Sequence, residues 1–155
     1  MPAPSRPPVK GTSLLFDVFV LAKAVQEMLS TAMADGPLTP EEYAVYSHLI
    51  EVQPCSPTAL ARDLRVPAAT VTDWVRTMTN RGHARRVPQP ADRRSYHLRL
   101  TAAGVRAHRR ANASFELVNA AFLAALLRPE AELRGHLADI IAATGTGTAT
   151  DPATG

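Results

Sequence analysis

The sequence predicts a mainly α-helical fold with one small β-hairpin. Along most of the chain, apolar residues recur at intervals of three and four, which is the spacing of one face of an α-helix. One stretch, 95–101, instead alternates apolar and polar residues, which is the pattern of a half-buried strand. Aromatic residues make up only 5% of the chain, so the core depends on aliphatic residues and alanine, a composition that favours helices. The 155 residues, 46% of them hydrophobic, are enough for one compact domain.

The first predicted helix lies within 13–37, after a proline-rich segment, 1–12, that we expect to be a disordered tail. Gly36-Pro37 ends this helix. Its apolar stripe consists of Leu14, Val18, Leu21, Val25 and Met28. Three more apolar residues widen the stripe: Phe16, Phe19 and Val20. The widened stripe exceeds what one neighbouring element covers, so we expect this helix to contact a second surface as well.

Three helix starts follow in the centre of the chain. Thr39, with Pro40 and Glu42 behind it, forms a capping box that begins the first of these helices. Ser56-Pro57 repeats the start signal for a short helix, and Pro67 begins another. Because the turn between these last two helices is brief, the pair is typical of a helix-turn-helix.

A hairpin is predicted directly after the helix-turn-helix. Its two strand-like runs are 83–88 and 95–101, separated by QPADRR (89–94), and the prolines confine the first run to a sheet edge. The apolar residues of the second run are Tyr96, Leu98 and Leu100. A hairpin in this position is a wing, so we assign 38–101 to a winged helix-turn-helix.

Two more helices are predicted after the hairpin. Thr101 caps a long helix, and a last helix follows a break at Arg128-Pro129; together they occupy 102–143. The low-complexity remainder, 144–155, is expected to be a flexible tail. A winged module needs only its own three helices and hairpin. The surplus apolar faces therefore predict a homodimer, in which 13–37 and 102–143 are the dimerisation helices.

Arginine is concentrated in one part of the sequence. Residues 76–110 contain ten arginines and a single acidic residue, Asp92, for a net charge of +9, whereas the whole chain carries +3. The remaining residues therefore carry −6. A basic segment on an acidic body indicates a polyanionic partner, with a solvated charged face as the alternative.

The sequence lacks the motifs of common catalytic and metal sites. It has no glycine-rich phosphate loop, no Gly-x-Ser-x-Gly and no His-Glu-x-x-His, so we expect no enzyme, no metal and no cofactor. His83 and His97 either meet across the hairpin or serve DNA contact or packing. No uncharged apolar run is long enough to span a bilayer, so no membrane partner is expected. The single cysteine, Cys55, is typical of a reducing cytoplasm and is expected to be inert.

One known family resembles residues 59–104, which read ALARDLRVPAATVTDWVRTMTNRGHARRVPQPADRRSYHLRLTAAG. Its most specific part is DRRSYHLRLTAAG: an Asp-x-Arg hairpin tip, an alternating strand, then Leu-Thr and a glycine three residues later. These residues resemble the MarR family of bacterial winged helix-turn-helix regulators, and the similarity in pattern covers about 38–127. The resemblance implies a homodimer whose two winged modules bind double-stranded DNA, at a palindromic operator, about one helical turn apart.

The resemblance also assigns a recognition helix, 67–80, to the major groove. Its exposed positions are Ala68, Ala69, Thr70, Thr72, Asp73, Arg76 and Thr77. Arg76 is suited to guanine or phosphate, and Asp73 either accepts from cytosine or pairs with Arg76. The sequence departs from the family's pattern in several places. Pro67 replaces a capping Ser or Thr, Asp73 stands where a basic residue is frequent, His83 and Ala84 replace larger apolar residues, and Tyr46 replaces a common leucine. These departures leave the operator sequence open, but not the DNA-binding class.

By position in the hairpin, Arg94 is the family's minor-groove arginine, assisted by Arg93. Asp92 is expected to orient an arginine, because phosphates repel a carboxylate. Arg86 and Arg99 are further candidates for phosphate contact. The arginines of the following helix either contact phosphates or balance acidic residues of the dimer: Arg106, Arg109 and Arg110.

The function implied by the resemblance is a cytoplasmic transcriptional regulator, a repressor released by a small molecule. Many relatives bind small aromatic or lipophilic anions beside the dimerisation helices. The matching side chains here are Phe16, Phe19, Tyr43, Tyr46 and His48, with Trp74 as a further candidate that is more simply a core residue. Two alternatives stay open: a winged-helix module that binds an acidic protein, and a ligand-binding protein that has lost DNA recognition.

Overall fold

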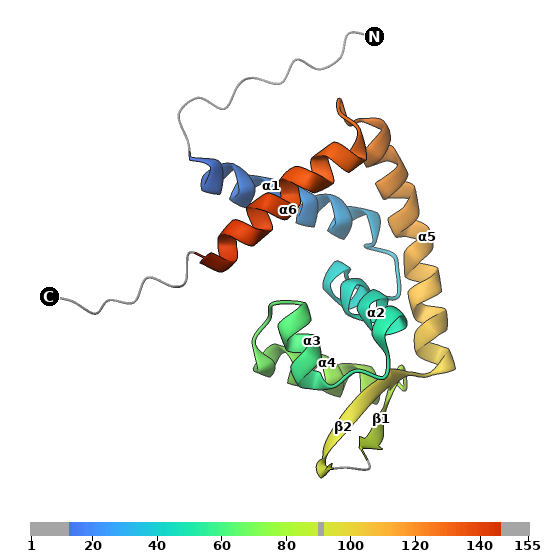
Figure 1. Cartoon of the computed structure of the whole chain (residues 1–155). Helices are drawn as coiled ribbons and strands as arrows, with labels where there is room; N and C mark the ends of the chain where they lie inside the picture. The colour runs from blue at the N-terminus through green and yellow to red at the C-terminus, as the bar shows by residue number, and fades with distance from the viewer. Residues whose placement is uncertain (1–12, 90–91, 147–155) are drawn as a thin grey trace, which may run out of the picture. The chain divides into compact units, whose positions relative to one another are not determined.

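The computed structural model describes residues 13–89 and 92–146, with side chains described for 13–88 and 95–145. Within these residues it contains six helices and one two-stranded antiparallel sheet (Figure 1). In chain order the elements are α1 (Leu14–Ala32), α2 (Pro40–Val52), α3 (Pro57–Asp63), α4 (Ala68–Asn80), β1 (Ala84–Gln89), β2 (Asp92–Leu100), α5 (Ala102–Ala124) and α6 (Glu130–Thr146). The predicted mainly helical class with one hairpin is confirmed. The predicted N-terminal tail, 1–12, and all but the first three residues of 144–155 lie outside the described residues; 144–146 continue α6.

The helix starts follow the capping signals of the sequence. The Thr39 hydroxyl accepts a hydrogen bond from the Glu42 backbone N–H, and the Glu42 carboxylate accepts one from the Thr39 N–H, which completes the predicted capping box. Ser56 caps α3 in the same way through the Ala59 N–H. Pro67 precedes α4 without a side-chain cap, so the first backbone N–H groups of this helix have no hydroxyl partner.

The core of the central region forms where α2, α3, α4 and the sheet meet. Its fully buried side chains are Val45, Tyr46, Leu49, Leu60, Val71, Val75 and Leu98. In the turn that joins α3 to α4, Arg65 adopts a φ of 53°, in the left-handed region that non-glycine residues enter at a cost of about 1–2 kcal/mol. The predicted helix-turn-helix is therefore present and fixed by its own apolar contacts.

The hairpin is held to the helical core at its base. Leu98 exchanges two backbone hydrogen bonds with Cys55, with N···O distances of 2.7 and 3.1 Å, so a single antiparallel β-bridge ties the loop before α3 to β2. Cys55 is buried, and this burial raises the pKa of its thiol, in agreement with its predicted inertness. β2 begins at Asp92, three residues before the predicted strand, because pairing with β1 continues from Pro88 to Gln89 through an irregularity in register.

Two compact units divide the chain between Val118 and Asn119, within α5. In the first unit, α5 contacts α2 through the Tyr43–Asn112 and Ser47–His108 hydrogen bonds, and Figure 1 shows the two helices side by side. The buried residues of α5 are Gly104, Ala107 and Ala111. No residue of α1 is buried, and Phe16 and Phe19 are 48% and 57% exposed. In the second unit, α6 leaves Leu137 and Ile141 exposed. Among the described residues, no helix is long and apolar enough to cross a membrane.

Candidate nucleic-acid interface

Helix α4 has one buried face and one open face. Val71, Val75 and Met78 are buried against the core. The predicted contact positions lie on the rest of the helix: Ala68, Ala69, Thr72, Asp73 and Arg76 are exposed, and Thr70 and Thr77 are half-buried. The 3.6-residue period therefore places most of these predicted contact positions on the accessible side, whereas Thr77 lies toward α2.

Asp73 and Arg76 form an ion pair on this open face. The Arg76 Nη2 atom lies 2.8 Å from the Asp73 Oδ1 atom, and their side chains are 68% and 63% exposed. The sequence left two roles open for Asp73, accepting a hydrogen bond from cytosine or pairing with Arg76, and in the structure Asp73 pairs with Arg76. An exposed pair of this kind contributes at most about 1 kcal/mol, so a guanine or phosphate can replace the carboxylate as the partner of Arg76.

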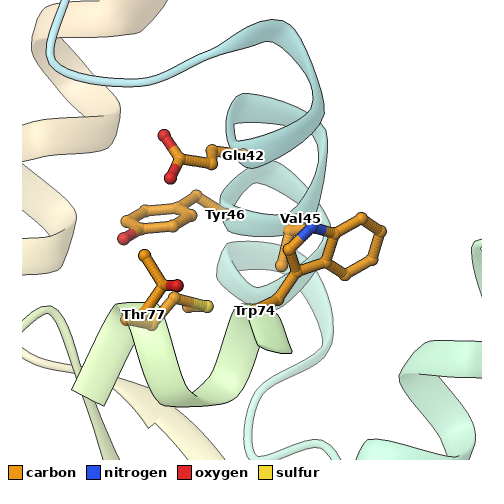
Figure 2. Close-up of a pocket in the computed structure, with 6 residues that line it drawn as sticks. Glu42, Val45, Tyr46, Trp74 and Thr77 are labelled. Atoms are coloured by element: carbon orange, nitrogen blue, oxygen red, sulfur yellow. The ribbon is translucent and has the colours of Figure 1, made fainter. Parts of the chain in front are cut away.

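Trp74 and Thr77 lie at the edge of α4 that faces α2. Figure 2 shows both side chains rising from α4 toward Val45 and Tyr46 of α2. Trp74 is half-buried and packs against the core, so it belongs to the edge of the core. The cavity between these residues has a volume of about 10 Å³, enough for one water molecule and too small for an organic ligand.

The hairpin carries its arginines on both faces. Arg85 and Arg99 are directly opposite each other in the antiparallel register and are both exposed. Like charges in such a cross-strand pair repel, and an anion between them removes that repulsion. Arg86 projects from the other face of the hairpin, where its guanidinium lies 4.6 Å from the centre of the Tyr96 ring in a cation–π contact.

The residues predicted at the tip of the wing are described only in part. Asp92, Arg93 and Arg94 form the first residues of β2, and Asp92 pairs with Gln89 in the register. Their side chains lie outside the described part of the structure. Their assignment to DNA contact therefore stays a prediction from the sequence.

The described arginines fall into two groups. Most of those away from the hairpin and the start of α5 pair with carboxylates at 2.6–2.9 Å, and these are Arg62, Arg76, Arg81, Arg128 and Arg134. A second set has neither an ion pair with a carboxylate nor a cation–π contact within 13–88 and 95–145, and it consists of Arg85, Arg99, Arg106, Arg109 and Arg110. All five arginines of this second set lie on the hairpin or at the start of α5.

A polar cluster beneath the hairpin escaped the sequence analysis. The Tyr46 hydroxyl lies 3.0 Å from the His83 Nδ1 atom, and beside them Arg81 pairs with Glu42 at 2.8 Å. Burial raises the pKa of Tyr46 to about 12, so its hydroxyl is neutral and suited to donate to His83. His83 and His97 do not meet across the hairpin: His97 is opposite Val87, and the His83 ring turns to α2. A tyrosine and a histidine 37 positions apart leave no local signal of such a contact.

The candidate ligand-binding side chains have different environments. The Tyr43 ring stacks between His108 and Phe115 of α5, and its hydroxyl donates to the Asn112 side-chain oxygen at 2.6 Å. Tyr46 is fully buried, whereas Phe16 and Phe19 are exposed on α1. The His48 Nε2 atom lies 3.3 Å from an Asp63 oxygen but makes no aligned hydrogen bond to any described residue. In the part of the chain covered by the structure, no three His, Cys, Asp or Glu residues are grouped to hold a metal ion.

Acidification is expected to destabilise the fold through His83 and His108. Burial lowers the pKa of both imidazoles below the ordinary 6.5, and Arg81 adds to this effect at His83. As the pH falls through about 6.5, the unfolded chain takes up protons that the folded chain does not, so stability is full above that pH and decreases below it. Urea unfolding at about pH 7.5 and about pH 5.5 measures the loss. It should be smaller in His108→Gln, and an equal loss in that variant would contradict this role of His108.

Comparison with known proteins gives a consistent result. The family model described as MarR family matches residues 38–96. A probable transcriptional regulator from Pseudomonas aeruginosa is 31% identical over 79% of this chain and 95% of its own, with a TM-score of 0.68. No curated protein matches in sequence.

Two further solved structures show the same fold at lower identity. The M. tuberculosis regulator MOSR, solved in complex with DNA, is 20% identical over 87% of this chain and 98% of its own, with a TM-score of 0.75. PcaV from Streptomyces coelicolor, solved with its natural ligand, is 24% identical over 90% of this chain and 99% of its own, with a TM-score of 0.69. Together with the family match over the helix-turn-helix and hairpin, these similarities identify the chain as a member of the MarR family, a winged helix-turn-helix transcriptional regulator and not an enzyme.

Proposed function

We propose that this protein is a homodimeric repressor that binds a palindromic DNA operator and is released by a small molecule. DNA binding is supported mainly by one observation: the described arginines of this protein include one set paired with carboxylates and another set without such partners. The five unpaired arginines lie on the hairpin and the start of α5, next to an α4 whose open face presents small, hydroxyl-bearing and charged side chains. Phosphate contacts from such arginines supply affinity, and the side chains of α4 supply specificity.

Within this proposal, α4 occupies the major groove and the hairpin tip the adjacent minor groove. The major-groove contacts come from Ala68, Ala69, Thr70, Thr72, Asp73, Arg76 and Thr77. At the wing, Arg94 enters the minor groove with Arg93, Asp92 orients one of them, and Arg86 contacts a phosphate. The DNA complex of MOSR, which shares the fold, supports this arrangement.

The homodimer is supported by the apolar residues that the chain leaves uncovered. Leu14, Leu15 and Phe19 of α1 are each more than half exposed. Apolar side chains grouped in this way are unfavourable in water and are typical of a surface that contacts another protein. We assign 13–37 and 102–143 to the dimer contact and 38–101 to DNA binding, in the cytoplasm, where the single reduced cysteine is stable. The mass in solution measured by light scattering should be twice that of the chain.

Release by a small aromatic or lipophilic anion is supported by the ligand complex of PcaV. Of the candidate side chains, Phe16 and Phe19 are accessible without rearrangement, and Tyr43 and His48 are half-buried. Tyr46 contacts a ligand only if its bond to His83 opens. A ligand of this class should therefore act by changing how α2 supports the base of the hairpin.

Selection of bound duplexes from a random pool tests the proposal as a whole. A palindromic sequence with half-sites about one helical turn apart is expected. If no duplex is selected, the protein is instead one of the two alternatives: a module for an acidic protein partner, or a ligand-binding protein in which the Asp73–Arg76 pair has replaced DNA recognition.

Binding to the selected duplex should weaken steeply with salt. Each arginine that neutralises a phosphate releases counterions, so the logarithm of the affinity falls linearly with the logarithm of the salt concentration. For six to ten phosphate contacts per dimer, affinity should fall by about a thousandfold or more between about 50 and about 200 mM salt. Fluorescence anisotropy titrations measure this slope, and a flat response would contradict the role of the unpaired arginines.

A further inference from the structure

We propose that Arg106 and Arg110, with Arg109 beside them, form a phosphate-binding stripe on α5 that contacts the DNA backbone outside the half-site bound by α4 and the hairpin. This inference rests on the proposed function. It adds a second contact region to the operator and lengthens the duplex that the protein needs for full affinity.

The stripe lies on the open side of α5. Gly104, Ala107 and Ala111 are buried against the core, and they define the inner face of the helix. Arg106 and Arg110 are four residues apart, so they lie one above the other on the same side, and both are exposed. The burial pattern thus leaves two guanidinium groups adjacent, with a third one residue away.

This charge arrangement is unfavourable for an isolated helix. Arg106 and Arg110 repel each other at this spacing, and Arg109 adds a third positive charge beside them. Every residue from Arg93 to Phe115 is non-acidic, and α5 has no acidic residue in its first turn. By contrast, α2 and α6 each begin with two glutamates in the first turn. A bound anion removes this repulsion, and a phosphate is the anion that a pair of guanidinium groups fits well.

Helix α6 provides the internal comparison. Here arginines use the same four-residue spacing, but with carboxylates: Arg134 pairs with Glu130 at 2.6 Å within the helix, and Arg128, just before it, pairs with Glu132 at 2.9 Å. The chain therefore neutralises helical arginines in one place and leaves them unpaired in another. The unpaired ones belong to the helix that follows the hairpin directly.

Because the stripe on α5 directly follows the hairpin, which is proposed to bind DNA, we favour DNA over an acidic protein as its partner. Only Thr101 separates the end of the arginine-bearing strand β2 from α5. The Thr101 N–H donates to the His83 carbonyl at 2.9 Å, and its hydroxyl accepts from the Gly104 N–H at 3.2 Å, so the first turn of α5 is fixed to the hairpin base. Arg99 and the stripe thus move as one surface, and a duplex bound by the former passes close to the latter.

The test uses the full-length protein and two charge-matched double variants. Arg106→Gln with Arg110→Gln removes the stripe, and Arg6→Gln with Lys10→Gln removes the same charge from residues 1–12, which are assigned neither to DNA binding nor to the dimer. Affinity is measured against salt on the selected duplex, and on the same duplex extended by about ten base pairs on each side, about one helical turn. The unaltered protein and the variant altered in residues 1–12 should show a steeper salt slope on the extended duplex.

In the α5 variant, the extra slope should disappear. Each lost phosphate contact reduces the slope by about 0.9, so two contacts in each of two subunits reduce it by about 3.6, with an affinity loss of tenfold or more at about 0.1 M salt. A slope on the extended duplex equal to that of the unaltered protein would overturn the stripe, as would an equal reduction on both duplexes, because the contact would then lie within the half-site. A weakened dimer with unchanged slopes would also overturn it, by assigning the arginines to the second subunit. These outcomes leave DNA binding by the unaltered protein intact, whereas its failure to bind either duplex would overturn the proposed function itself.

Discussion

Replacement of Arg94 by alanine should weaken binding to the selected duplex by about 10- to 100-fold and leave the dimer intact. A minor groove narrowed by its sequence concentrates negative potential, and an arginine inserted there contributes about 1–3 kcal/mol. Because Arg94 lies at the start of β2, far in sequence from the proposed dimerisation helices, its removal should not change the mass of the particle in solution. Gel-shift titration measures the affinity.

The matched control is Arg6→Ala, which removes the same charge from residues 1–12, a segment assigned neither to DNA binding nor to the dimer. It should bind with the affinity of the unaltered protein. If Arg94→Ala also binds unchanged, the assignment of the hairpin tip to the minor groove is wrong, and the affinity must come from α4 and the remaining arginines.

Replacement of Gly104 by alanine should destabilise the fold by about 3 kcal/mol, which corresponds to a decrease in Tm of about 10 °C for a chain of this length. A Cβ atom at position 104 would overlap the backbone carbonyl of His83, which cannot move without displacing the base of the hairpin. The same carbonyl accepts the hydrogen bond from Thr101, so the substitution affects the junction between β1 and α5 directly.

Gly135→Ala is the control for this substitution. Gly135 lies inside α6 with no neighbouring atom within 4 Å of the added methyl group, so alanine should stabilise the helix by about 0.5–1 kcal/mol. Thermal unfolding followed by circular dichroism should therefore move in opposite directions for the two variants. A Gly104→Ala protein that unfolds at or above the Tm of the unaltered protein would contradict the close contact with His83.

The elements that the sequence predicted well are those governed by local chemistry. The Thr39 capping box depends on residues three positions apart, and the alternation of Tyr96, Leu98 and Leu100 depends on one strand, so both patterns are visible in the sequence and are confirmed. The family resemblance added the order of the elements. The open face of α4 was also predictable, because apolar residues recur along this helix with the 3.6-residue period of an α-helix and mark its buried side.

The features that the sequence did not reveal depend on residues distant along the chain. The pairing of Arg81 with Glu42 and of Tyr46 with His83 spans more than 35 positions in each case, and composition cannot distinguish a paired arginine from an unpaired one. The separation of arginines into two sets therefore required coordinates. The candidate ligand-binding residues share aromatic character, but their neighbours differ because α1, α2 and α5 each present them to a different environment.

The backbone bridge between Cys55 and Leu98 makes the only thiol of the chain a natural probe of local opening. A modifying reagent reaches this sulfur only when the loop before α3 separates from β2, and the raised pKa of the thiol slows its reaction further. The rate of labelling therefore reports how often the wing detaches from the helices beneath it. Operator DNA should slow the labelling of Cys55, and an inducing molecule should accelerate it. The labelling rate of this one native side chain therefore distinguishes the DNA-bound protein from the ligand-bound protein without an added fluorophore.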